Sequence, residues 1–348
     1  MLLDPTLTTQ PPTTAAPDAE ALALEHYGKV LTAHELTGER DRNFHMVGDN
    51  GEQFLFKVVN PAEPADIVHL QNGALNHIRD FAPALPVPHP VAAGDGAYHA
   101  SITLADGRAT LARMLTYLPG LPLSKAPRSP AQRRALGQCL AELDIALQGF
   151  EHPAASHELL WNVSTAHRLK GMIDSIADPG RQAMVRRFMA HYEAETLPRL
   201  GGLRAQVIHN DFNLGNVLVE PDDTDSVAAI IDFGDVVHGP LVGDIATAAA
   251  YQLTDAYDPL LNAAEMIGGY DATLPLLGEE RDVLADLVIA RLFVTVLITG
   301  WRAERYPENR TYILRNNGPA WAGLDLFDGM SRDDARGRLL QFCSTGEF

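Results

Sequence analysis

One short stretch limits the possible folds and functions of this chain more than any other: VIHNDFNLGNVLVE, residues 207–220. It places a histidine, an aspartate and several asparagines between two apolar runs, where a core would normally be built. Buried polar groups are costly unless they have partners or a function. A second apolar run ends in IIDFGD, residues 230–235, and turn-forming residues at 221–226 separate the two. The pattern predicts a strand–loop–strand hairpin that holds polar groups for a chemical purpose.

Three of these polar residues suit phosphoryl transfer. Asp211 is followed five positions later by Asn216, and Asp232 begins the next loop. Asn216 and Asp232 offer the oxygen ligands that Mg2+ prefers, with nucleotide phosphates and water completing its shell. Asp211 is then left to orient the attacking hydroxyl and accept its proton. The alternative is that these side chains only cap a hairpin as turn residues.

Length and charge narrow the class of protein. At 348 residues the chain exceeds the size at which single cores stop growing, so we expect two lobes. The formal net charge of −18 is spread along the chain, which argues against nucleic acid and membrane-surface partners. Cys139 and Cys343 lie far apart and form no ligand pair, which suits the reducing cytoplasm. We therefore expect a cytoplasmic protein.

Two segments bear on targeting. Residues 1–18 are rich in Pro and Thr and lack the basic start and apolar core of a signal peptide, so we expect a disordered leader. The most apolar later segment, residues 284–301, is interrupted by Asp286 and Arg291. We interpret it as a buried helix rather than a membrane span.

The order of periodic segments predicts an α+β protein with a β-rich and an α-rich part. The first part, residues 19–118, should hold a helix that stops at Gly28, several antiparallel strands and one further helix. The second part, residues 119–348, should be mostly helical. The segments behind this prediction are helices at 19–28, 65–81, 129–149, 164–177 and 180–197, three strands within 33–60 with a hairpin turn at 49–51, and strands at 98–104 and 109–118.

The hairpin segments VIHNDFNLGNVLVE and IIDFGDVVHGPLVGDIATAAAY resemble the catalytic and metal-binding motifs of the aminoglycoside phosphotransferase family. These small-molecule kinases share the protein kinase fold. Within the family, GERDRNF, FLFKVVNPAEPADIVHLQNGAL, RMLTYLPG, LLWNV and RAERYPENRTYILRNNGPAW most resemble hydroxylysine kinases and the related domain fused to class III aminotransferases. The resemblance covers nearly everything after the leader. It implies a small nucleotide-binding N-lobe and a larger catalytic and substrate-binding C-lobe.

The resemblance also implies a nucleotide site. Lys57 would grip the α and β phosphates, the turn at residues 37–44 would cover them, and the base would lie against the hinge. Gln71 stands where many kinases place a glutamate that holds the lysine, and a neutral amide gives a weaker hold than an ion pair. The residues expected to bind the nucleotide are Lys57, Arg40, Asn43, Gln71, Thr116 and Leu118.

Two residues are expected to support the catalytic loop. His209 precedes the catalytic aspartate, and we expect it to brace the loop through hydrogen bonds rather than to move protons. Asp244 opens a predicted helix, so its simplest role is that of an N-cap. The resemblance implies that Asp244 also anchors the backbone of the catalytic loop.

The substrate residues are expected in the helical lobe. The segments that resemble hydroxylysine kinases contain Trp161, Trp301, Arg302, Arg305, Tyr306 and Trp321. An arginine there could hold a substrate carboxylate in a bidentate fork. The alternative is that the tryptophans belong to the core and the arginines are solvated. Asn162 stands where that group is expected to have an aspartate, so the specificity could differ.

Together these features predict a kinase that uses Mg2+ and ATP or GTP to phosphorylate a small hydroxylated amine or amino acid, with 5-hydroxylysine as the leading candidate. An aminoglycoside, or an amino alcohol such as choline, ethanolamine or a homoserine-like compound, is the alternative acceptor. A catalytically silent nucleotide-binding module is a further alternative. The 13 histidines show no ligand spacing that would favour a zinc enzyme. The sequence does not decide between ATP and GTP, and it gives no oligomeric state.

Overall fold

The computed structural model describes residues 5–7, 9–38, 40–253 and 257–344. The chain divides into two compact units, Met1–Pro119 and Gly120–Phe348, which we call the N-lobe and the C-lobe. The N-lobe is built on a sheet, and the C-lobe is mostly helical.

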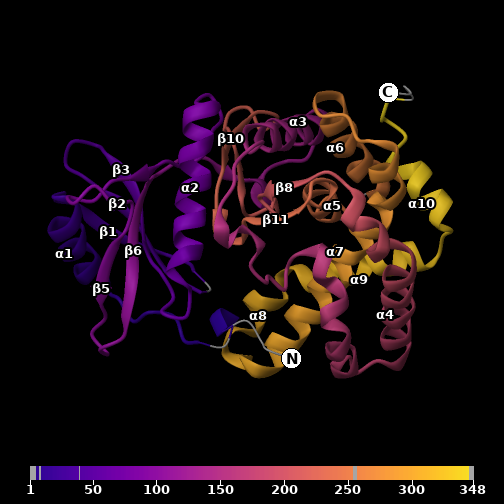
Figure 1. The fold of residues 1–348 in the computed structure, drawn as a ribbon, viewed down its shortest axis with the longest axis horizontal. Coiled ribbons are helices and arrows are strands. Elements are labelled where there is room, and N and C mark those ends of the chain that lie inside the picture. The colour runs from indigo at the N-terminus through magenta and orange to yellow at the C-terminus, as the bar shows by residue number, and fades with distance from the viewer. Residues whose placement is uncertain (1–4, 8, 39, 254–256, 345–348) are drawn as a thin grey trace. The chain divides into compact units, whose positions relative to one another are not determined.

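The N-lobe sheet is antiparallel, with strand order β1-β2-β3-β6-β4 and β5 paired to β6. Helices α1 and α2 lie against its two faces (Figure 1). All of these strands and helices except β4 were predicted from the sequence. Their bounds are β1 (Thr32–Leu36), β2 (Arg42–Val47), β3 (Gln53–Val58), β4 (Pro90–Val91), β5 (Ala100–Thr103), β6 (Ala109–Thr116), α1 (Ala16–Tyr27) and α2 (Ala65–Phe81).

Alternation along the strands sends apolar and polar side chains to opposite faces of this sheet. Phe44, Phe56 and Met114 are buried in one core with Ala19 and Ala23 of α1. The neighbouring positions on the three central strands, Asn43, Lys57 and Arg113, therefore share the other face. Arg113 reaches α2 there, and its Nη1 donates to Oδ1 of Asn72 at 3.0 Å.

Helix α1 begins at Ala16, three residues before the predicted start at Ala19. Pro17 is tolerated in the first turn of a helix. The carboxylate of Asp18 also accepts a hydrogen bond from the N–H of Ala15 at 3.0 Å, which satisfies a donor that the helix leaves open. Gly28 ends the helix with φ of 63°, as the sequence predicted.

The C-lobe contains two small antiparallel strand groups. The predicted hairpin is confirmed by the pairing of β9 with β10, and β7 extends it on the other side of β9. The pairing of β8 with β11 was not predicted. The strands are β7 (Leu121–Pro122), β8 (Ala205–Ile208), β9 (Val217–Val219), β10 (Val227–Ile230) and β11 (Val237–Pro240).

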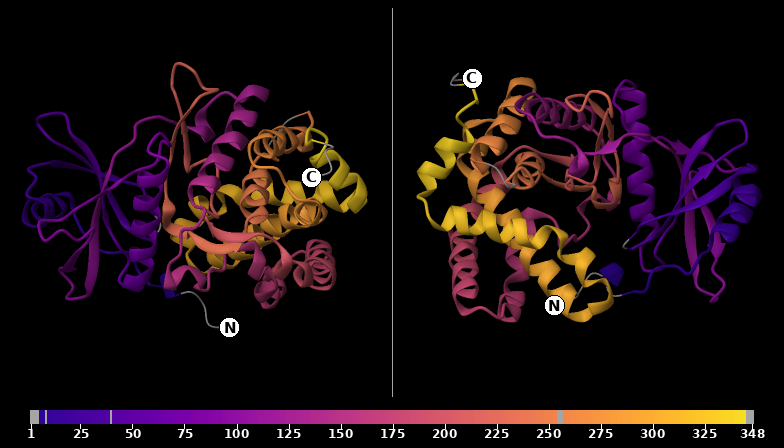
Figure 2. Two further views of the ribbon diagram at one scale, coloured as in Figure 1. Left: turned by 45° about the horizontal axis from the view of Figure 1, so that its top comes forward. Right: turned by 180° about the vertical axis from the view of Figure 1, so that it is seen from behind.

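Helices make up the rest of the C-lobe, and α7 is at its centre. Helix α7 packs against α5 and α9, and the C-terminal helices α9 and α10 lie along it (Figure 2). By length and composition α7 could cross a membrane, but 89% of its most apolar window is buried inside the structure. The helices are α3 (Pro130–Ala146), α4 (Pro179–His191), α5 (Val242–Ala250), α6 (Pro259–Thr273), α7 (Gly278–Arg305), α8 (Arg310–Ile313), α9 (Asn317–Asp328) and α10 (Arg332–Leu339).

Two predicted α-helices of the C-lobe take other forms. Most of the helix predicted at 164–177 is a 3-10 segment, η4 (Val163–Ser175), rather than an α-helix. Its buried residues Val163, Ala166, Leu169 and Met172 recur every third position, which matches the three residues per turn of a 3-10 helix. The helix predicted at 180–197 ends at His191, and a π-helical turn follows over Tyr192–Thr196.

Candidate active site

The loop between β8 and β9 is held from behind by Asp244. This residue is fully buried, and its two carboxylate oxygens accept the backbone N–H groups of His209 and Asn210, each at 2.8 Å. The prediction of an N-cap is wrong: Leu241 occupies the N-cap, and Asp244 lies inside the first turn of α5. From that position its carboxylate serves the loop instead of its own helix.

A second buried carboxyl, Asp144 on α3, supports Asp244. Both residues are fully buried, and their carboxyl groups hydrogen-bond to each other. Tyr270 donates its hydroxyl to the other oxygen of Asp144 at 2.7 Å. Burial, and then the neighbouring carboxyl of Asp244, hold the pKa of Asp144 well above its usual range. The raised pKa favours the protonated form of Asp144 beside Asp244. The sequence analysis did not detect this supporting role.

His209 uses both ring nitrogens to hold the loop. Its Nδ1 accepts the backbone N–H of Asp211 at 3.2 Å, and its Nε2 lies 3.2 Å from the carbonyl oxygen of Ile231. A carbonyl can only accept, so Nε2 carries the proton and the ring is the neutral tautomer. These contacts suit a bracing role, because neither nitrogen faces a reacting group.

The side chain of Asp211 is fixed by donors from three other residues. Its Oδ2 accepts from the amide groups of Asn213 at 2.9 Å and Asn216 at 2.8 Å. Its Oδ1 accepts from Nη2 of Arg291 at 2.9 Å. Burial raises the pKa of Asp211 to about 6, the nearby Asp235 raises it too, and Arg291 opposes the shift. The group is therefore still ionised at neutral pH, as a base must be.

Arg291 is a functional candidate that the sequence analysis missed. It comes from the middle of α7, and its side chain is only 1% exposed, against 20% for Asp211. Its Nη1 donates to the carbonyl of Trp161 at 2.7 Å, and its Nη2 also donates to the hydroxyl of Tyr251 at 3.0 Å. A charged residue within an apolar helix needs a partner, and this signal was present in the sequence.

Asn216 and Asp232 lie at the same end of the β9–β10 hairpin. The backbone N–H of Ile231, next to Asp232, donates to the carbonyl oxygen of Asn216 at 2.8 Å. The amide nitrogen of Asn216 is used on Asp211, so Oδ1 is the side-chain atom that Asn216 can offer to a cation. The carboxylate of Asp232 is exposed. Two oxygen atoms at one end of the hairpin are suitable ligands for a hard divalent cation.

Backbone strain marks the same region. Within the described residues, the left-handed backbone conformation is adopted by two residues other than glycine, Asn210 and Asp232, each with φ of 63°. This conformation is costly for such residues and persists where the surroundings enforce it. The strained residues border the loop and the hairpin end that carry Asp211 and Asn216.

Trp161 is the predicted substrate residue that lies closest to this chemistry. The Arg291 guanidinium contacts both its carbonyl and its ring, with 5.2 Å between the guanidinium carbon and the ring centroid. The next residue, Asn162, is buried, and its side chain accepts the N–H of Ser164 at 2.9 Å to cap η4. Asn162 thus has a structural role in this chain.

The two predicted substrate arginines differ in their environments. Arg302 is buried on α7, and it lies about three turns beyond Arg291 on the same side of the helix. Arg305 is exposed, and its guanidinium stacks on the ring of Trp301 at 3.7 Å. Trp321 is buried under Arg181, with 4.6 Å between the guanidinium carbon and the ring centroid. Trp301 and Trp321 therefore belong to the packed C-lobe.

In the N-lobe, Lys57 forms an ion pair with Asp41, with 2.9 Å between Nζ and Oδ2. Asn43 lies opposite Lys57 in the register of β2 and β3. Arg40 belongs to the same turn as Asp41, and its carbonyl accepts from the side chain of Asn60 at 3.0 Å. Glu39, within the predicted phosphate-covering turn, lies outside the described residues. Gln71 is buried on α2.

Two of the backbone N–H groups in the expected hinge already have partners in the N-lobe. The N–H of Thr116 donates to His89 at 2.9 Å, and that of Tyr117 donates to Gln53 at 3.2 Å. These groups are used within the N-lobe. The expectation that the backbone at residues 116–118 offers a donor and an acceptor to a nucleotide base stays a prediction, and the N–H groups of Thr116 and Tyr117 are not its donor.

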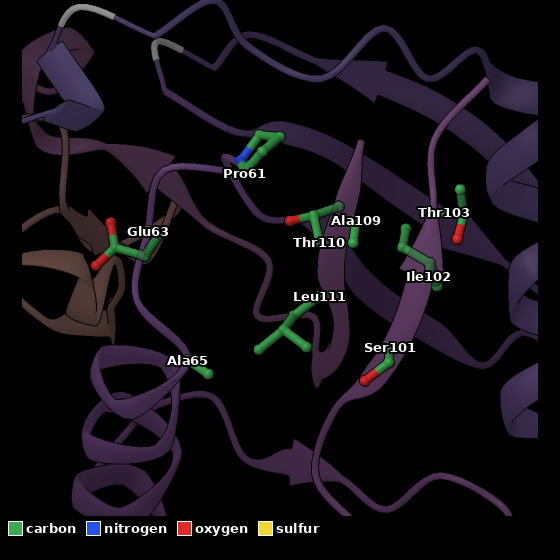
Figure 3. A pocket seen from close by; sticks show the side chains of 9 residues that line it. All are labelled: Pro61, Glu63, Ala65, Ser101, Ile102, Thr103, Ala109, Thr110 and Leu111. Carbon is green, nitrogen blue, oxygen red and sulfur yellow. The ribbon is translucent and has the colours of Figure 1, made fainter. Parts of the chain in front are cut away.

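The N-lobe also carries an open hollow of about 330 Å³ between the β5–β6 hairpin and the start of α2 (Figure 3). None of the predicted site residues lines it. Its lining residues are Pro61, Glu63, Ala65, Ser101, Ile102, Thr103, Ala109, Thr110 and Leu111.

With this geometry in place, comparison with known proteins identifies the class. The chain belongs to the APH phosphotransferase enzyme family, whose sequence profile matches residues 32–278. It is 26% identical to hydroxylysine kinase of Mus musculus over 334 residues, which cover 89% of this chain and 88% of that protein. The predicted family resemblance is confirmed. The protein is a kinase that phosphorylates the hydroxyl group of a small molecule.

Solved structures show the same fold. The microcompartment-associated aminopropanol kinase matches with a TM-score of 0.64 and 18% identity, covering 91% of this chain and 98% of that one. Amicoumacin kinase hAmiN, in complex with AMP-PNP, Ca2+ and Ami, matches with a TM-score of 0.60 and 15% identity, covering 81% of this chain and 87% of that one. The predicted α+β, protein kinase-like fold is confirmed.

Proposed function

We propose that this kinase transfers the γ-phosphate of ATP or GTP, bound with Mg2+, to the hydroxyl of a small hydroxylated amine or amino acid, and that 5-hydroxylysine is its substrate. The observation that carries the proposal is the carboxylate of Asp211, which is fixed by Arg291, Asn213 and Asn216 beside a hairpin end with two oxygen ligands. The similarity to hydroxylysine kinase supports the choice of substrate.

Each residue then has a defined task. Asp211 Oδ2 or Oδ1 accepts the proton of the substrate hydroxyl as that oxygen attacks the γ-phosphorus. The bond from the γ-phosphorus to the β,γ-bridging oxygen breaks, and the nucleoside diphosphate leaves. Arg291 keeps the carboxylate ionised and correctly turned, while Asn216 ties it to the hairpin. Asn216 Oδ1 and the carboxylate of Asp232 would hold Mg2+, which neutralises phosphate charge when bound. Lys57 would bind the α and β phosphates.

The substrate class follows from the charges on α7. An amino acid carries a carboxylate that needs a cation, and a buried guanidinium can hold it in a bidentate fork. Arg302 is buried on the side of α7 that carries Arg291, whereas Arg305 is exposed and stacks on Trp301. We therefore assign the carboxylate contact to Arg302. An aminoglycoside would instead need several carboxylates around its ammonium groups.

A coupled kinase assay tests this proposal. The panel contains 5-hydroxylysine, homoserine, ethanolamine, choline and kanamycin, each with ATP and with GTP. We expect the highest kcat/KM with 5-hydroxylysine. Preferential turnover of kanamycin or of a carboxylate-free amino alcohol would contradict the substrate assignment and leave the phosphoryl-transfer site intact. Absence of turnover with every acceptor would favour a silent nucleotide-binding module.

A further inference from the structure

We propose that Asp41, on the turn between β1 and β2, positions Lys57 for the nucleotide phosphates and supplies the negative charge that many kinases take from the helix of the N-lobe. The proposal rests on the proposed function, because it assumes that Lys57 binds the nucleotide. All the residues that carry it belong to the N-lobe.

The ion pair between the two side chains is short and sheltered. The 2.9 Å between Lys57 Nζ and Asp41 Oδ2 is a hydrogen-bonding distance, and the two side chains are only 11% and 16% exposed. Charge-assisted hydrogen bonds are stronger than neutral ones, and shielding from water strengthens them further. The pair can therefore fix the ammonium group of a long, flexible side chain.

The sheet itself creates a need for this negative charge. Lys57 on β3 lies directly opposite Arg113 on β6, so two cations share one face at neighbouring positions. Like charges directly opposite each other destabilise a sheet. The Nη1 of Arg113 donates to the neutral amide of Asn72 on α2. Asp41 brings a negative charge to Lys57 from the turn between β1 and β2.

Asp41 is itself anchored to the strand that carries Lys57. Its second oxygen, Oδ1, accepts the backbone N–H of Asn60 at 2.7 Å. Asn60 is fully buried just beyond the end of β3, and its side chain donates to the carbonyl of Arg40 and accepts the N–H of Ala62. The turn and the strand end are thus tied together through one asparagine. Asp41 cannot move without breaking these bonds.

Gly38 allows the turn to close in this form. A Cβ atom at position 38 would come within 2.5 Å of the carbonyl oxygen of Asp41 and within 2.9 Å of the side-chain nitrogen of Asn43. Both distances are shorter than real contacts, so a side chain at 38 would push the turn away from Lys57. The glycine, the carboxylate and the lysine therefore form one arrangement.

This arrangement accounts for the glutamine at position 71. A neutral amide on α2 supplies no charge to Lys57, and the structure provides the charge from the phosphate-covering turn instead. The position of Lys57 is then coupled to the order of that turn. In a chain with a helix glutamate, it would be coupled to the position of the helix.

The test measures Mg–nucleotide dissociation constants by calorimetry, so it does not require a known acceptor substrate. Asp41→Asn keeps the acceptor for the Asn60 N–H and removes only the charge. We expect it to weaken binding by about 10- to 100-fold, the range for one charge-assisted contact. Asp41→Glu keeps the charge and should bind at least about fivefold more tightly than Asp41→Asn. Glu35→Gln is the matched control, because it removes an exposed carboxylate from the preceding strand and should bind like the wild type.

A double-mutant cycle separates positioning from general loss of structure. If Asp41 acts through Lys57, Asp41→Asn should add nothing to the effect of Lys57→Met. An equal loss in both backgrounds, or equal binding by Asp41→Asn, Asp41→Glu and the wild type, would overturn this inference about Asp41 and leave the proposed function intact. Absence of nucleotide binding by the wild-type protein would overturn the proposed function and this inference with it.

Discussion

In each lobe of this kinase an ion pair holds one functional side chain. The functional group is the anion in the C-lobe and the cation in the N-lobe. In the C-lobe the carboxylate of Asp211 is the candidate base, and the buried Arg291 supports it. In the N-lobe the ammonium group of Lys57 is the candidate phosphate ligand, and Asp41 supports it. The supporting group is 1% exposed in the first pair and 16% exposed in the second.

The difference indicates how each lobe keeps its site in order. Arg291 comes from a core helix and also contacts Trp161 and Tyr251, so the C-lobe site is fixed by the folded core itself. Asp41 comes from a turn that one asparagine ties to a strand end. The comparison therefore predicts that damage to the first pair appears mainly as lost stability, and damage to the second mainly as lost nucleotide affinity.

Arg291→Met should have the largest effect on stability. It leaves the Asp211 carboxylate partly buried without its cation, and breaking a buried pair from one side costs about 3–5 kcal/mol. Chemical denaturation would measure this free energy of unfolding. Lys57→Met is the comparison variant, and its cost should be smaller because its pair is less buried. Equal losses in the two variants would remove the distinction between the lobes.

Asp232→Ala should abolish most Mg–nucleotide binding. Metal-mediated stabilisation of phosphate charge is worth several kcal/mol, so we expect a loss of about 100-fold or more. Affinity for the metal-free nucleoside should persist, because the hinge rather than Asp232 is expected to contact the base. Calorimetry with both ligands measures this difference. Unchanged Mg–nucleotide affinity would remove Asp232 from the metal site.

Arg302→Met should raise the KM for an amino acid substrate by about 10- to 100-fold, because one charge-assisted contact is lost. Arg305→Met is the matched control on the same helix. Since Arg305 is exposed and stacked on Trp301, its loss should change KM by no more than about threefold. Steady-state kinetics with 5-hydroxylysine compares them. A larger effect at Arg305 would reverse the assignment.

Asp144→Asn should have the smallest effect at neutral pH. The folded state holds the pKa of Asp144 above its unfolded value, so it binds a proton that the unfolded chain releases. This group's contribution to stability therefore falls as pH rises above the unfolded pKa of about 3.9. The Asp144→Asn variant has no such proton, so its free energy of unfolding should depend less on pH between 5 and 8. Urea denaturation across that pH range measures the free energy of unfolding. If this energy changes with pH in the variant as much as in the wild type, the proton on Asp144 is contradicted.

Local patterns were sufficient to predict much of this protein. Turn residues and period-two alternation gave the strands around Lys57, and helical spacing gave both ends of α2. The spacing of Asp211, Asn216 and Asp232 indicated phosphoryl transfer, because Asp211 and Asn216 lie on the loop before β9 and Asp232 follows its partner strand β10. In each case the interacting residues lie on the same element or on neighbouring ones.

The supporting residues were missed because their partners are distant in sequence. Arg291 lies 80 positions from Asp211, and nothing local shows that α7 crosses behind the catalytic loop. Asp144 on α3 and its partner Asp244 on α5 are likewise distant in sequence. Asp41 directly precedes the strand that pairs with that of Lys57, but a carboxylate in a turn has many local uses. The 3-10 segment η4 was also predictable from its three-residue spacing.

The most direct test of the central claim compares turnover and nucleotide binding in Asp211→Ala. If Asp211 accepts the hydroxyl proton, kcat with 5-hydroxylysine should fall by about two to four powers of ten, the range for a general base. The dissociation constant for Mg–nucleotide should stay within about threefold of the wild type, because the base does not contact the nucleotide in this account. Turnover equal to that of the wild type would contradict the assignment of Asp211 as the catalytic base.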